Sequence, residues 1–65
     1  MSLKYYIIPD PLAQELGLTV SRKGSADDGW LVHIGDLAAY GVERAEQNGA
    51  REVSLSEARQ FANRH

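Results

Sequence analysis

The side chains with the most chemistry to offer are two histidines, His33 and His65, and an acidic turn, Asp27–Gly29. A histidine works as a general base or a metal ligand only when partner groups stand at a suitable spacing. The sequence places no such partners beside either histidine, so we expect His33 to pack against neighbours or to lie at the surface. The acidic turn resembles a fragment of a calcium-binding loop, but the alternate ligands and the distal glutamate are missing. We therefore expect a polar hairpin tip there and no metal site.

Other patterns that carry chemistry are missing from the chain. There is no cysteine, which excludes disulfides and thiolate metal sites. Gly24, Gly29 and Gly35 lack the spacing of a phosphate-binding loop, and no serine stands in a nucleophile elbow. Glu43 and Glu46 lie on the polar face of a predicted helix, where solvation is the simpler explanation. Because a core this small leaves little volume for a water-shielded pocket, we expect no enzyme, no catalytic residues and no cofactor.

One stretch has the pattern of a DNA-binding element. Leu12–Thr19 is typical of the first helix and turn of a helix-turn-helix domain, which needs a second helix to enter the major groove. The next residues, Leu18–Arg22, alternate between apolar and polar types, which favours a strand. The formal net charge of −2 also gives no electrostatic reason to expect a polyanion. A small nucleic-acid-binding regulator that uses Leu12–Lys23 is therefore our second hypothesis.

The N-terminal half predicts a strand, a helix and a hairpin. Leu3–Ile8 is rich in β-branched and aromatic residues and apolar on both faces, which is typical of a central strand. Asp10 is placed to cap a helix over Pro11–Leu16. After that helix, Leu18–Arg22 and Trp30–Ile34 are predicted to form the two strands of a hairpin, joined by a long, mobile polar loop.

The C-terminal half predicts a helix, an edge strand and a last helix. Asp36 is placed to cap a helix whose apolar stripe runs over Ile34–Ala45, with Gly41 indicating close packing or a local break. Ala50–Val53 is a short, charged strand suited to a sheet edge. Ser54–Glu57 has the spacing of a capping box, which starts the last helix. The inward side of that helix is expected to consist of Leu55, Ala58, Phe61 and Ala62.

These elements define the expected fold. We predict one α+β domain over residues 1–65, a small, mostly antiparallel sheet packed against two or three helices in the order β-α-β-β-α-β-α. The hydrophobic share of 43% and the charged share of 25% are ordinary for a soluble globular protein. No apolar run approaches the roughly 20 residues that span a bilayer, and none resembles a signal peptide. We therefore expect a cytoplasmic protein with no membrane partner.

The remaining candidates for function are aromatic side chains. Tyr5, Tyr6, Trp30 and Tyr40 are numerous for so short a chain, and tyrosine and tryptophan favour interfaces because they combine contact area with a polar end. The competing interpretation is that they cover the rim of the core. We expect a non-enzymatic protein–protein interaction or regulatory module of bacterial or phage type. Because small cores often need support from self-association, monomer and homodimer stay equally open, as does a site formed between protomers.

Overall fold

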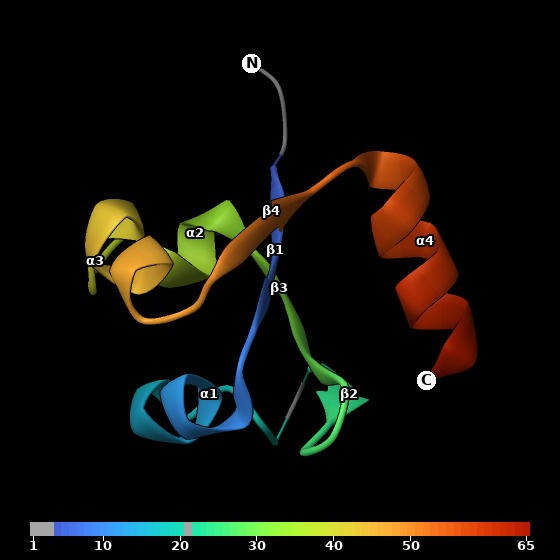
Figure 1. Ribbon diagram of the computed structural model, residues 1–65, viewed down its shortest axis with the longest axis horizontal. Coiled ribbons are helices and arrows are strands. Elements are labelled where there is room, and N and C mark those ends of the chain that lie inside the picture. Colours follow the sequence, from blue (N-terminus) through green and yellow to red (C-terminus); the bar gives the residue numbers. More distant parts are fainter. Residues whose placement is uncertain (1–3, 21) are drawn as a thin grey trace.

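The strand β1 (Tyr5–Ile8) lies at the centre of a four-stranded antiparallel sheet in this computed structural model, which describes residues 4–20 and 22–65. The order of strands is β2-β3-β1-β4, and helices lie on both sides of the sheet (Figure 1). The α+β prediction and the central position of the first strand are confirmed. Leu3, which we included in that strand, lies outside the described residues. The other elements are α1 (Asp10–Leu16), β2 (Lys23–Ser25), β3 (Gly29–His33), α2 (Ile34–Leu37), α3 (Val42–Gln47), β4 (Arg51–Val53) and α4 (Leu55–Arg64).

Both faces of the sheet are packed because β1 is apolar on both sides. Tyr6 and Ile8 point to the side of α1, α2 and α3, where they join the main core. The opposite face lies under α4, which buries Ala58 and Phe61 against it. Figure 1 shows α1, α2 and α3 on one side of the strands and α4 on the other. The main core consists of Tyr6, Ile8, Leu12, Ala13, Val32, Leu37 and Ala45.

The prediction of a strand over Leu18–Arg22 is wrong. Gly17 adopts a left-handed conformation (φ 70°) and Leu18 N–H donates to the Ala13 carbonyl at 2.9 Å, so both residues close α1. Val20 is 92% exposed, which shows that the alternating pattern does not reflect a half-buried strand. Within the predicted segment, Ser21 lies outside the described residues.

The true second strand is shorter and later in the chain. Lys23–Ser25 pairs with Gly29–Leu31 around a turn over residues 26–28, so the predicted mobile loop is in large part a tight hairpin. Gly24 permits this approach, because a Cβ there would lie 2.2 Å from the Gly29 carbonyl oxygen. No helix stands between α1 and β2 in the residues that the structure describes, so the helix-turn-helix arrangement does not form.

The single helix predicted to start at the Asp36 cap and to end at Asn48–Gly49 is two short helices, α2 and α3. The break falls at Gly41, whose φ of 105° lies outside the helical region, and this is one of the two outcomes that its position predicted. The helix cap was also misplaced. His33, not Asp36, is the N-cap of α2, and the Asp36 carboxylate accepts from the His33 backbone N–H at 3.0 Å.

Asp10 is likewise the first residue of its helix and not the cap, which is Pro9. Its carboxylate instead accepts a hydrogen bond from the indole Nε1 of Trp30 at 2.9 Å, which ties α1 to β3. Asp10 was predicted to act only on its own helix, but its side chain connects two segments that are 20 residues apart in the sequence.

Two predictions for the C-terminal segment hold, namely the charged edge strand and the N-cap of the last helix. β4 is a charged edge strand that pairs with β1 alone among the described strands. Ser54 is the N-cap of α4, and its Oγ accepts from the Glu57 N–H at 3.1 Å. The other half of the capping box is used differently, because the Glu57 carboxylate accepts from Arg51 Nη1 at 2.7 Å.

A candidate protein-binding groove beside α4

The four aromatic residues singled out in the sequence lie in different surroundings. Tyr6 is 3% exposed and belongs to the core, so its ring is not accessible to a partner. Trp30 is half-buried and held by Asp10, and Tyr40 is half-buried under the guanidinium of Arg44, 4.6 Å from the ring centroid. Tyr5 is half-buried on the α4 side of the sheet.

These aromatic rings do not form one patch. The strand register places Tyr5 opposite His33, and the two rings meet edge to face at 5.5 Å. Trp30 stands opposite Ile8, on the other face of the sheet from Tyr5. Of the predicted contact residues, Tyr5 therefore has the surroundings that form a candidate site.

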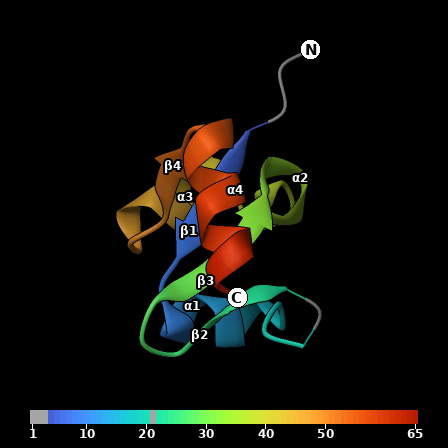
Figure 2. The same ribbon diagram turned by 90° about the vertical axis from the view of Figure 1, so that its right-hand side faces the viewer.

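Tyr5 and Leu31 form the common floor of two adjoining hollows, which we call the α4 groove. One hollow, of about 280 Å³, lies against α4 and is lined further by Leu55, Ala58, Arg59 and Ala62. The other, of about 380 Å³, lies towards β2 and α2. Figure 2 looks onto α4, with β4 on one side of the helix, α2 on the other, and β3 passing behind it. The second hollow is lined by Arg22, Lys23, Val32, His33 and Asp36 as well as the two floor residues.

The α4 groove exists because α4 covers its face of the sheet incompletely. The helix presents Ala58 and Ala62 beside the floor, and these short side chains leave Tyr5 and Leu31 half-buried. Leu55 was expected to point inward, but it is 54% exposed at the start of the helix. A large apolar side chain is therefore exposed next to two half-buried ones, which is an arrangement that a partner can cover.

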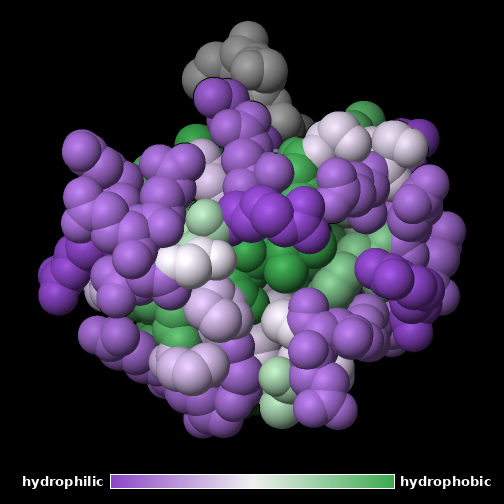
Figure 3. Space-filling model, in the orientation of Figure 1, coloured by the Kyte–Doolittle hydropathy of each residue, from purple (hydrophilic) through white to green (hydrophobic). Residues whose placement is uncertain are grey.

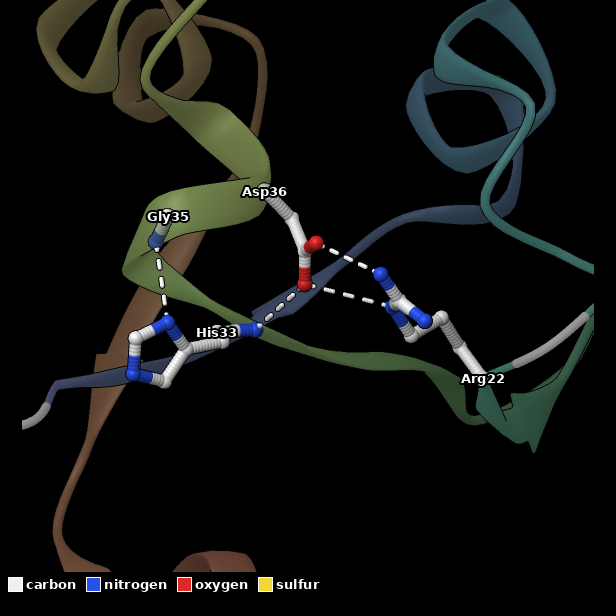
Figure 4. A network of polar contacts seen from close by, with 4 residues as sticks. All are labelled: Arg22, His33, Gly35 and Asp36. Atoms are coloured by element: carbon white, nitrogen blue, oxygen red, sulfur yellow. Dashed lines mark hydrogen bonds and ion pairs between the residues drawn. The ribbon is translucent and has the colours of Figure 1, made fainter.

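A polar network fixes one wall of the α4 groove (Figure 4). The Arg22 guanidinium donates from Nε to Asp36 Oδ2 at 3.2 Å and from Nη2 to Asp36 Oδ1 at 2.5 Å. The Gly35 N–H donates to His33 Nδ1 at 3.1 Å, so this imidazole nitrogen serves to cap α2. His33 therefore caps α2, a role that its sequence context did not predict, and its ring also packs edge to face on Tyr5.

The electrostatics of this wall centre on Asp36. Burial by itself would raise the pKa of Asp36, but the hydrogen bonds from Arg22 and from the His33 backbone and the positive charge of Arg22 outweigh it. The pKa of Asp36 therefore lies below its ordinary value. At neutral pH the carboxylate is ionised and is neutralised by Arg22, so the pair adds little net charge to the groove.

Two further cations give the α4 groove its charge. Lys23 and Arg59 are both exposed and line the two hollows. Neither forms an ion pair within the described part of the chain. With Arg22 and Asp36 cancelling, these two charges make the groove positive, although the whole chain has a formal net charge of −2. The groove and the rest of the surface therefore differ in sign.

A third hollow, of about 410 Å³, lies at the other end of β1 and is acidic. Asp10, Asp27 and Asp28 line it together with Ile7 and Arg51. The hydrophobic surface lies elsewhere: Figure 3 shows it in the middle of the view, between β4 and α4, surrounded by hydrophilic residues. In the described residues no group of three or more potential ligands is arranged to hold a metal ion. His65, at the nearby end of α4, packs on Phe61 and places Nε2 3.1 Å from the Asp28 carboxylate.

The sequence indicated Tyr5 as a contact residue, and it placed Arg22 and Lys23 only in the alternative nucleic-acid segment Leu12–Lys23. Leu55 was expected to point inward, and Arg59 belongs to a helix that was expected only to pack. No local pattern marks these residues, because they come together only when α4 folds back over β3 and β1.

Comparison with known proteins identifies no relative: no family model matches the chain, and no curated protein or solved structure is significantly similar to it. Among the described residues, no helix has the length and apolar character needed to cross a membrane.

Proposed function

We propose that this chain is a non-enzymatic protein-binding module that holds a partner segment in the α4 groove. The observation that carries the proposal is the exposed Leu55 beside the half-buried Tyr5 and Leu31. Protein interfaces gain most of their binding energy from a few such apolar or aromatic side chains that become fully desolvated. In this proposal Tyr5, Leu31 and Leu55 anchor the partner segment through apolar contacts. Lys23 and Arg59 orient the segment through their charges.

The partner that fits is a segment with an apolar side chain flanked by aspartate or glutamate. The apolar side chain would cover Tyr5 and Leu31, and the acidic groups would face Lys23 and Arg59. Complementary charges at the rim of an interface select the partner and speed its arrival. A nucleic acid suits this surface less well, because only two cations stand without a paired acid and the apolar floor offers nothing to a phosphate backbone.

The test is selection from a displayed library of random 12-residue peptides, followed by titration of synthetic copies. We expect enriched peptides to combine acidic residues with leucine or an aromatic residue. Leu55→Glu should weaken their binding at least about tenfold, equivalent to about 1.4 kcal/mol. The variant should keep its fold, because an acidic residue in the first turn interacts favourably with the helix dipole.

The matched control is Val20→Glu, which makes the same kind of change at the other large exposed apolar side chain of the described residues, one that does not line the groove. It should leave peptide affinity unchanged. Arg59→Glu should also abolish the preference for acidic peptides, whereas Arg44→Glu on α3 should not. The proposal fails if no peptide is enriched, or if the selected peptides bind Leu55→Glu as tightly as the original chain.

A further inference from the structure

The sheet ends in two open edges, one at β2 and one at β4. In the described chain each of these strands is hydrogen-bonded to a single neighbour, β3 or β1. An open edge presents unpaired backbone groups that another strand can use, and proteins often block such edges with charge. The two edges of this sheet differ in this respect.

Self-pairing is opposed at β4. Consider a second copy that pairs antiparallel with β4 about a twofold axis normal to the sheet, so that every side chain stays on its own face. In the register that overlaps all of β4, the central residue Glu52 stands directly opposite Glu52 of the second copy. Like charges in directly opposed positions destabilise a strand pair. The β4 edge is therefore protected against a second copy.

The β2 edge carries no such conflict. In its full register Gly24 stands opposite Gly24 of the second copy, and Lys23 stands opposite Ser25. The central glycine brings no charge and no side-chain clash into the pair. Along the chain, basic residues open the strand and Asp27 and Asp28 follow in the turn.

The same twofold axis also makes the charges complementary. Lys23 of each copy stands opposite Ser25 of the other, and Asp27 follows Ser25 by two residues in the turn, so the axis brings the exposed Lys23 and Asp27 of different copies to the same end of the contact. Neither Lys23 nor Asp27 forms an ion pair in the part of the chain that the structure describes, so both charges are available. Asp28 is already placed against His65.

We infer that a second copy of this chain pairs edge to edge along β2, which joins the two sheets into one with both α4 helices on the same face. The contact is independent of the α4 groove except that Lys23 lines both. Because two three-residue strands bury less surface than a standard interface of about 1,600 Å², the dimer should dissociate on dilution.

Sedimentation velocity over a concentration series tests the inference. The chain should shift from monomer to dimer as concentration rises, and high salt should weaken the dimer. Lys23→Glu and Asp27→Lys, each alone, should reduce dimerisation at least about tenfold, because each sets like charges against one another across the axis. The double variant Lys23→Glu/Asp27→Lys should restore it, since the ion pair is re-formed with its signs exchanged.

Glu52→Lys at the opposite edge is the matched control and should leave the dimer unchanged. The inference is overturned if the original chain stays monomeric at every concentration, if the double variant fails to recover what the single variants lose, or if Glu52→Lys abolishes the dimer. Peptide binding separates the two proposals. Asp27→Lys should disrupt the dimer and spare the groove, whereas Arg59→Glu should do the reverse.

Discussion

The pairing of Arg22 with Asp36 connects the segment before β2 to α2, and Asp36→Asn removes its charge while preserving its shape. The pair is partly exposed, with 31% and 21% of the two side chains accessible. Fully exposed pairs contribute up to about 1 kcal/mol, and breaking a buried pair costs about 3–5 kcal/mol. An intermediate loss of about 1.5 kcal/mol is therefore expected. A domain of this size has a total stability of roughly 3–10 kcal/mol, so the loss is readily measured.

Urea unfolding followed by Trp30 fluorescence and circular dichroism measures this loss. With a slope of about 1 kcal/mol per molar urea, the midpoint should fall by about 1.5 M. Glu15→Gln, a similar change on the exposed side of α1, should leave the midpoint within about 0.5 M. Because Arg22 makes a further interaction beyond the contacts described, a double-mutant cycle with Arg22→Ala is needed to isolate the energy of the pair.

The pH dependence of the same variant gives an independent check. The pKa of Asp36 is lower in the folded protein than in the unfolded chain, so its contribution to stability is complete above about pH 5 and is lost as pH falls through the folded value. The unfolding curves of the original chain and of Asp36→Asn should converge in acid. A midpoint for Asp36→Asn equal to that of the original chain at pH 7, or a gap that widens in acid, would refute the reasoning.

Two further predictions concern the core and a helix cap. Burial, with the charges of Glu46 and Glu52, raises the pKa of Tyr6 above its ordinary value of 10.0, so stability should fall as pH rises past 10. Tyr6→Phe should flatten this loss between about pH 10 and 12 in urea unfolding, and an unchanged slope would contradict the assignment. Ser54→Ala should cost about 1 kcal/mol through loss of the bond to Glu57, whereas Ser56→Ala inside the same helix should cost less than about 0.5 kcal/mol. Equal losses for the two serines in thermal unfolding would show that the cap contributes nothing.

Local signals were sufficient where one short stretch controls the outcome. The apolar character of both faces of Tyr5–Ile8 placed β1 in the centre, and the charges of Arg51 and Glu52 placed β4 at an edge. Ser54 caps α4 as its spacing predicted. In each case the deciding interaction lies within a few residues or reflects simple burial.

Local signals failed where two structures compete for the same residues. Leu18 fits an alternating strand, but Gly17 allows the chain to turn at the end of α1, and the Leu18 N–H then bonds to the helix and not to a neighbouring strand. The stripe through Ile34–Ala45 fits one helix, but Gly41 turns the chain and divides it. In both cases a glycine with positive φ interrupts the helical conformation, and the sequence shows the glycine without showing which of the two structures forms around it.

The sequence by itself determined the class of fold, the central strand and the charged edge, because alternation, capping and charge act along the chain. Only the tertiary structure decided which side chains share a surface. Tyr5, Leu31 and Leu55 are far apart in the sequence, and they meet because β3 pairs with β1 and α4 folds back across both. Their partial exposure depends on the short side chains of Ala58 and Ala62 beside them, and this effect has no local signature.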